Sequence, residues 1–162
     1  MNYRIKLALT CTSTELVDPN GDLLECQDIS LDLCNDPTFG GDVSVSFCYV
    51  VTNTGAFEDT VQKLERDLNG EVRDILASVP TEDTILQPGD SLSVCEESEL
   101  SLCAGVFHSN CVETDATPPG AEPCVDDMCY TIITGTLPPT PPPTPPPTLP
   151  PTRAPCEIEV RT

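Results

Sequence analysis

Ten cysteines in a chain of 162 residues constrain the fold more than any other feature of this sequence. A reducing cytosol rarely tolerates such a density as ordinary core residues, so the cysteines indicate a disulfide framework formed in an oxidising compartment. The sequence leaves their pairing open. We expect four bridges and one remaining thiol among the disulfide candidates Cys11, Cys26, Cys34, Cys48, Cys95, Cys103, Cys111, Cys124 and Cys129.

Two chemical uses of cysteine compete with this interpretation. Zinc prefers clustered thiolates and imidazoles, whereas the closest pair here is Cys124 and Cys129, and His108 is the only histidine. A nucleophile pair of His108 with Cys111 or Cys103 is disfavoured, because residues three apart on a strand point to opposite faces and a secreted cysteine is usually bridged. We therefore predict no catalytic residue, no metal ligand, no cofactor and no enzyme activity.

The chain is strongly acidic, with a formal net charge of −20. This charge excludes nucleic-acid binding, which needs a basic footprint to neutralise phosphates. An acidic surface can attract divalent cations, basic partners or a cationic matrix. The simpler interpretation is that the acids keep a secreted module soluble.

Residues 43–53 alternate apolar and polar side chains with period two, which predicts a half-buried antiparallel strand. By this alternation Cys48 points away from the core. We therefore expect it to bridge to an outer loop or a neighbouring strand, and not to connect two sheets. The core itself must be mostly aliphatic, because the chain has no Trp, four Phe and three Tyr.

Further strands are predicted at residues 4–12, 28–33, 60–66, 71–75, 91–95, 105–113 and 128–133, separated by turn signals. Residues 60–76 also fit a helical spacing. We favour a hairpin there, because Asn69-Gly70 is the strongest two-residue hairpin turn and is costly inside a helix. Pro88-Gly89 predicts a type II turn before the strand at 91–95.

Three segments follow one another along the chain. Residues 1–136 form a predicted Cys-rich β-sandwich module, residues 137–155 a Pro/Thr-rich linker, and residues 156–162 the first strand of a further module. As polyproline II, Pro138 to Pro155 span about 55 Å, and a spacer is favoured over a docking peptide. Cys156 is then expected to have its partner beyond this chain.

The N-terminal residues lack an apolar region long enough for a secretory signal, and no segment is long enough to cross a membrane. We expect the chain to be a fragment of a longer extracellular or cell-surface protein.

The sequences VVTNTG at residues 50–55 and LQPGDSLSV at residues 86–94 resemble the repeated immunoglobulin-like surface-protein domains that carry "YTVTNTG" and later "LxPGxSxxV". This resemblance implies an all-β, immunoglobulin-like antiparallel sandwich. It also implies a structural or adhesive role beside neighbouring modules, with cell-wall or matrix components as possible partners. The many cysteines depart from the pattern. At the motif itself, we expect Asn53 to satisfy local backbone groups and Gly55 to take a positive φ.

A ligand-binding module is the alternative function, with glycans or weakly bound calcium held by acidic loops. Asp18 to Asp22 place oxygens at alternate positions as calcium loops do, but Leu23 and Ile29 occupy the places of the Gly and Glu that such a loop requires. A plain turn is therefore favoured. Exposed aromatic side chains suited to a sugar are predicted to be few.

Overall fold

The computed structural model describes residues 4–105 and 107–133, which form two antiparallel β-sheets and short 3-10 turns. The predicted spacer at 137–155 and the predicted strand at 156–162 lie outside these residues. The first sheet has the order β2-β1-β3-β7 and the second β5-β4-β8-β9, with β6 added beside β4. The strands are β1 (Ile5–Val17), β2 (Leu23–Glu25), β3 (Asp42–Asn53), β4 (Asp59–Leu68), β5 (Glu71–Asp74), β6 (Ile85–Leu86), β7 (Ser91–Ser101), β8 (Phe107–Thr117) and β9 (Cys124–Ile133).

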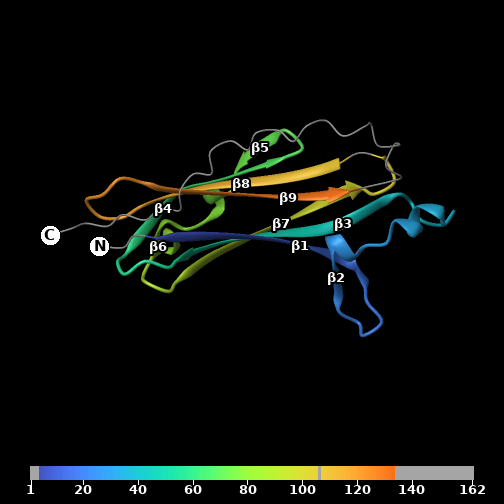
Figure 1. Cartoon of the computed structure of the whole chain (residues 1–162), viewed down its shortest axis with the longest axis horizontal. Coiled ribbons are helices and arrows are strands. Elements are labelled where there is room, and N and C mark those ends of the chain that lie inside the picture. Colours follow the sequence, from blue (N-terminus) through green and yellow to red (C-terminus); the bar gives the residue numbers. More distant parts are fainter. Residues whose placement is uncertain (1–3, 106, 134–162) are drawn as a thin grey trace, which may run out of the picture.

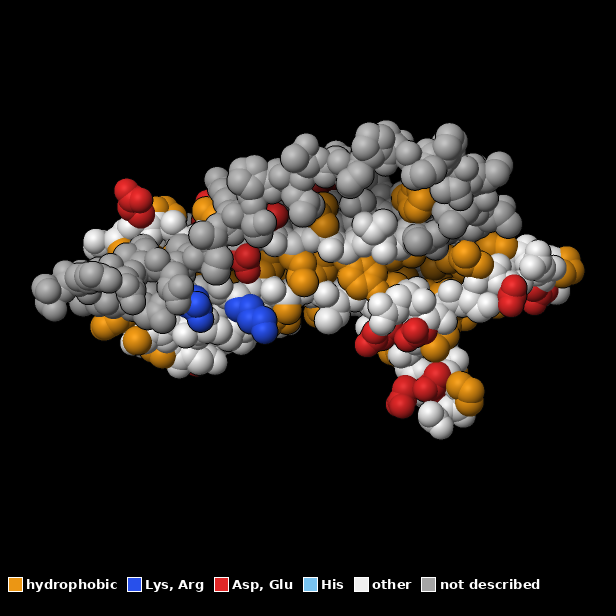
Figure 2. All heavy atoms as spheres, in the orientation of Figure 1, with side chains coloured by type: hydrophobic (Ala, Val, Ile, Leu, Met, Phe, Trp, Pro, Cys, Tyr) orange, Lys and Arg blue, Asp and Glu red, His pale blue; other side chains and the backbone are white. Residues whose placement is uncertain are grey.

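The two sheets lie in two layers, with β1, β3 and β7 in one and β4, β8 and β9 in the other (Figure 1). The β1–β2 hairpin projects away from these layers, and Figure 2 shows acidic side chains gathered on it. Strands β1 and β9 meet at one side, where the Leu7 N–H donates to Asp126 Oδ2 over 2.9 Å. The Asp126 side chain thus accepts a hydrogen bond from a backbone N–H of β1 that is not used in pairing with β3.

Strand β3 is the centre of the first sheet, paired with β1 over residues 45–53 and with β7 over residues 42–52. Its side chains alternate between buried and half-buried, as the sequence predicts. The buried members are Val43, Val45, Phe47, Tyr49 and Val51. They meet Val61 and Leu64 of β4, Val112 of β8 and Ile132 of β9 in one hydrophobic cluster. This cluster fills the space between the sheets and is mainly aliphatic.

The prediction of a strand at residues 28–33 is wrong. This segment lies in and between two 3-10 turns, Cys26–Asp28 and Leu31–Asn35. Cys26 and Cys34 are both bridged, and the Ser30 side chain accepts a hydrogen bond from the Asp32 N–H. These local constraints turn the chain where apolar residues alone suggested an extended strand.

Other predicted strands exist but are longer than their apolar patterns. β1 continues to Val17, β7 to Ser101 and β8 to Thr117, while β9 begins earlier, at Cys124. The added residues are mostly Ser, Thr, Glu and Asp, whose backbone groups still complete the ladders. Hydrogen bonding extends the strands where hydrophobicity gives no signal.

The β4–β5 hairpin confirms the choice of a turn over a helix at residues 60–76. Leu68 pairs with Glu71, and the two turn residues Asn69 and Gly70 have φ values of 54° and 89°. These are the two positive values that a type I′ turn requires.

Within the described residues, no helix is long and apolar enough to serve as a membrane span.

We predict that Gly70→Ala lowers the free energy of unfolding by about 1–2 kcal/mol, because a Cβ disfavours a positive φ. No atom lies within 4 Å of the added Cβ, so the cost comes from the backbone. Gly40→Ala is the matched control, since Gly40 has the same open surroundings without a positive φ. Urea unfolding of the oxidised protein measures both, and equal losses would contradict the type I′ assignment.

Candidate functional site

Eight of the nine disulfide candidates form four bridges among the described residues. Two bridges join residues that face each other directly across neighbouring strands, Cys48–Cys95 between β3 and β7 and Cys111–Cys129 between β8 and β9. Their Cα atoms are 4.1 and 4.0 Å apart, the close spacing of opposed residues in an antiparallel ladder. The prediction that Cys48 bridges within its own sheet, and not between sheets, is confirmed.

The other two bridges hold the irregular N-terminal region. Cys11–Cys26 ties β1 to the first 3-10 turn, and Cys34–Cys103 ties the second to the segment after β7. The prediction of four bridges among the nine candidates is confirmed, but the ninth, Cys124, is disulfide-bonded as well and is not a remaining thiol. No described cysteine is therefore available as a free nucleophile.

The two halves of the sequence motif meet at one end of the layers. Gly89 donates its N–H to the Asn53 carbonyl over 2.8 Å, and the Asn53 N–H donates to the Asp90 carbonyl over 3.0 Å. Gly89 has a φ of 90°, and the Asp90 N–H donates to the Gln87 carbonyl, which confirms the predicted turn at Pro88. Sequence reasoning found both segments but missed that they bind each other.

Asn53 satisfies backbone groups as predicted, and it is almost fully buried. Its Nδ2 donates to the carbonyls of Phe57 and Leu86, and its Oδ1 accepts from the Gly55 N–H over 2.9 Å. The prediction of a positive φ at Gly55 is wrong. The Asn53 side chain and the Arg4 carbonyl, which also accepts from the Gly55 N–H, hold the turn without a left-handed residue.

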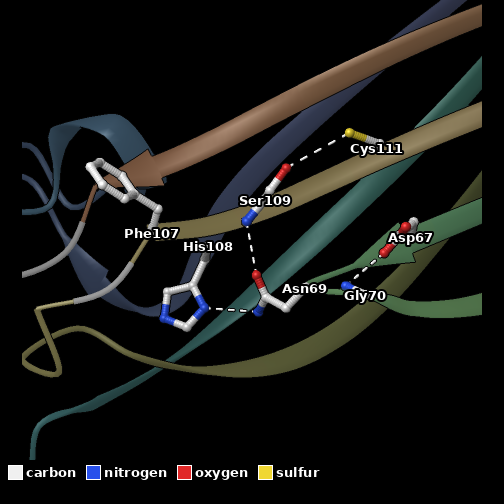
Figure 3. A pocket seen from close by; sticks show the side chains of 7 residues that line it. All are labelled: Asp67, Asn69, Gly70, Phe107, His108, Ser109 and Cys111. Carbon is white, nitrogen blue, oxygen red and sulfur yellow. Dashed lines mark hydrogen bonds between the residues drawn. The ribbon is translucent and has the colours of Figure 1, made fainter.

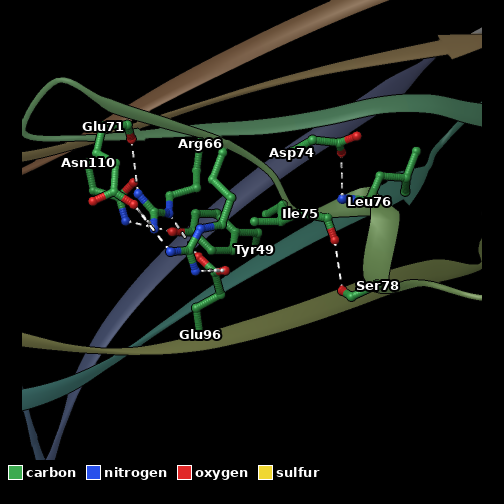
Figure 4. A network of polar contacts seen from close by, with 10 residues as sticks. Tyr49, Arg66, Glu71, Asp74, Ile75, Leu76, Ser78, Glu96 and Asn110 are labelled. Atoms are coloured by element: carbon green, nitrogen blue, oxygen red, sulfur yellow. Dashed lines mark hydrogen bonds and ion pairs between the residues drawn. The ribbon is translucent and has the colours of Figure 1, made fainter.

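A buried polar network crosses between the two sheets (Figure 4). Arg66 of β4 is 4 % exposed, and its Nε donates to Glu96 Oε2 of β7 over 2.8 Å. Its Nη1 also donates to the Glu71 carbonyl over 3.0 Å. Beside this pair, Asn110 Nδ2 of β8 donates to the hydroxyl of the fully buried Tyr49 over 2.8 Å.

The electrostatics of this network follow from burial and from its charge pair. Burial raises the pKa of Tyr49, and the hydrogen bond from Asn110 opposes that shift. Burial acts to lower the pKa of Arg66, but its contacts with Glu96 outweigh this and hold the guanidinium charged. Strand β7 is an edge, so an inward carboxylate there also opposes pairing with another chain.

We predict that Glu96→Gln lowers the free energy of unfolding by about 2–3 kcal/mol, because the buried Arg66 guanidinium loses its closest charge partner. The matched control is Glu97→Gln, whose exposed side chain is next in sequence on the opposite face of β7. Chemical denaturation of the parent chain and both variants measures their free energies of unfolding. Indistinguishable midpoints for the two variants would show that the buried pair contributes nothing.

Asp59, at the start of β4, is a buried carboxylate, and neither of its oxygens has a well-aligned hydrogen-bond partner among the described residues. Its residue is 1 % exposed, and burial raises its pKa above the ordinary value. The folded state therefore binds this proton more tightly than the unfolded chain does. The stability from this group is greatest below the unfolded pKa of about 3.9 and is lost as pH rises through the folded value.

We predict that Asp59→Asn raises the free energy of unfolding at pH 7 by on the order of 1 kcal/mol, because it removes an unpaired buried charge. It should also flatten the fall in stability on raising the pH from 4 to 7. Asp22→Asn, at an exposed side chain of the projecting hairpin, serves as the control. Urea unfolding of both variants and the parent chain between pH 4 and pH 7 measures this difference. An Asp59→Asn variant that is less stable than the parent chain at pH 7 would refute the assignment of Asp59 as a destabilising buried charge.

One hollow lies where the β4–β5 turn meets the start of β8, with a volume of about 520 Å³ (Figure 3). Asn69 fixes its shape by donating from Nδ2 to His108 Nδ1 and accepting from the Ser109 N–H at Oδ1, both over 2.9 Å. On the other side of the ring, His108 Nε2 donates to the Ser101 carbonyl over 3.1 Å. Both ring nitrogens are occupied, and Cys103 and Cys111 are bridged, so the Cys/His pair is not assembled.

A second hollow of about 250 Å³ adjoins the first and shares Asp67 and Cys111 with it. Both residues alternate along their strands with the buried Arg66 and Val112, which places them on the outer face of the second sheet. Phe107, at the rim of the first hollow, is 59 % exposed, and Val72, at the second, is 58 % exposed. Sequence reasoning missed both hollows, because the first is lined by two strands and a turn and the second by four strands, all distant in sequence.

The plain turn that the sequence favours over a calcium loop at residues 18–22 is confirmed. Asp18 Oδ1 accepts from the backbone N–H groups of Asn20 and Asp22, and the hydrogen bond from Asp22 is the main reason that its pKa is lowered. Gly21 has a φ of 92°, as a tight turn requires. Among the described residues, no group of three or more His, Cys, Asp or Glu side chains is arranged to hold a metal ion.

No protein-family model and no curated protein matches this sequence. Among solved structures, the chain is similar to one provisionally assigned as the ApaA protein of Bordetella pertussis, with 13 % identity, 82 % of this chain and 94 % of that chain covered, and a TM-score of 0.50. It is also similar to the structural genomics target SoR45, with 10 % identity, coverage of 80 % and 86 %, and a TM-score of 0.49. The first likeness concerns the fold alone.

Proposed function

We propose that this chain is a non-catalytic structural or adhesive module of a multi-module surface or secreted protein. The observation that carries the proposal is the set of four disulfides that join described residues, which indicates an oxidising, extracellular environment. Two of them bridge neighbouring strands within a sheet and two anchor its loops, so they stabilise a scaffold. Neighbouring modules and cell-wall or matrix components are the partners that such a scaffold would have.

The connectivity supports the finer assignment to an immunoglobulin-like sandwich. Strands β1, β3 and β7 form one layer, and β5, β4, β8 and β9 the other, so the chain crosses between layers as in modules of that architecture. The bonds between Asn53 and the Pro88-Gly89 turn give the resembling motif a structural role. Modules of this kind space or display other domains, and their exposed loops can bind other molecules.

Location is tested by labelling intact, non-permeabilised cells of the source with an antibody against the module. Surface labelling that is lost after external protease treatment is expected. Labelling that requires permeabilised cells would overturn the extracellular assignment.

We predict that the disulfides limit how far force can extend the module. The Cys34–Cys103 bridge has a sequence separation of 69 residues and encloses Cys48–Cys95. Reduction should therefore lengthen the unfolded chain by more than about 240 Å, at ~3.5 Å per residue. Single-molecule pulling with and without reductant measures this difference, and a Cys34→Ser/Cys103→Ser variant controls for direct effects of the reductant. Equal extension in both conditions would contradict the bridged scaffold.

A further inference from the structure

The outer face of the second sheet carries an unusual row of like charges. Glu65 of β4 lies directly opposite Asp74 of β5 on one side and Glu113 of β8 on the other, and Glu113 in turn lies opposite Asp127 of β9. Four carboxylates thus follow one line across all four strands of the sheet's main path. Like charges directly opposite one another in a sheet destabilise it.

One cation of the chain partly offsets this repulsion. Lys63 Nζ lies 2.6 Å from Glu113 Oε1 and 3.8 Å from Glu65 Oε1. The hydrogen bond with Glu113 is the main reason that the pKa of Lys63 is raised. Arg66 contacts Glu96 and Glu71 and is buried between the sheets, so its charge is directed away from the row. Asp127 at the far end has no ion pair among the described residues.

The row borders a groove with an apolar floor and rim. In the next outward-facing register, Val72, Asp67, Cys111 and Cys129 lie opposite one another across the same four strands. The Cys111–Cys129 disulfide forms the floor, and the two adjoining hollows extend from the row to the exposed ring of Phe107. Asp67 Oδ1 accepts from the Gly70 N–H, and Oδ2 accepts no bond from the described residues.

We propose that this groove binds an extended, arginine- or lysine-bearing peptide segment of a partner protein. This inference rests on the proposed adhesive role and names the partner's chemistry. The row spans about 14 Å, at ~4.8 Å between strands, which is too long for one small cation. An extended segment presents every second side chain on one face, about 7 Å apart. Its cationic heads can then meet Asp67 and the row, above all Asp127, while its aliphatic stems pack on the disulfide and Phe107.

The probe is a fluorescent peptide with alternating Arg and Gly, and its citrulline counterpart removes the charge at nearly constant shape. Anisotropy titrations with the full oxidised chain should give saturable binding of the Arg peptide that weakens from 20 to 150 mM salt. The citrulline peptide should bind at least tenfold more weakly. No binding of the Arg peptide at millimolar concentration would overturn the proposal.

Matched variants separate the groove from the general charge of the chain. Asp67→Asn/Asp127→Asn should raise the Kd at least fivefold, while Glu97→Gln/Glu99→Gln, exposed on β7 of the other sheet, removes the same charge and should change it less than twofold. Phe107→Ser should raise the Kd about threefold. Equal losses in both double variants would overturn the site in favour of nonspecific attraction.

Three further outcomes separate the proposal from effects on folding, from competition within the chain and from the proposed function. Asp127→Asn relieves repulsion in the row, so its melting temperature should equal or exceed that of the parent chain. A tighter Kd in Arg153→Gln would show that the chain's own Pro/Thr-rich segment competes, and would overturn the assignment to a partner. Surface labelling without peptide binding would leave the extracellular role intact and refute only the groove.

Discussion

The inward-facing side chains of β3 lie between the two sheets, and the rest of the structure is arranged around their burial. Phe47 and Tyr49 are the two largest fully buried side chains, and both sit in the middle of this strand. Burying an aromatic or branched aliphatic side chain contributes about 1.5–3 kcal/mol each. Since β3 pairs on both edges, its register also fixes which faces of β1 and β7 turn inward.

Polar groups inside this core make its packing specific. A one-residue slip of β4 or β7 would separate Arg66 from Glu96, and a slip of β8 would move Asn110 away from Tyr49. A buried charge without its partner costs several kcal/mol, so such alternatives are disfavoured. Asp59 shows the opposite case, a buried carboxylate that has no cationic partner among the described residues and is tolerated at the start of β4.

The outer faces of the two sheets carry two disulfides and a row of carboxylates. Cross-strand bridges at Cys48–Cys95 and Cys111–Cys129 close pairs of strands that are already opposed by the ladder. On the same face as Cys111, carboxylates that repel one another occupy opposed positions. A sheet that tolerates such a row is held by its core and its bridges, and Lys63 offsets the charge of only Glu65 and Glu113.

The sequence by itself determined the all-β class, the outward direction of Cys48 and the hairpin at Asn69-Gly70, because period-two alternation and turn chemistry are local properties. It could not determine the 3-10 turns around Cys26 and Cys34, which depend on bridges to distant residues. Nor could it show that Asn53 binds the Pro88-Gly89 turn or that Glu65, Glu113 and Asp127 stand in line. Only the tertiary structure decided these, since the pairing register places side chains from separate strands opposite one another.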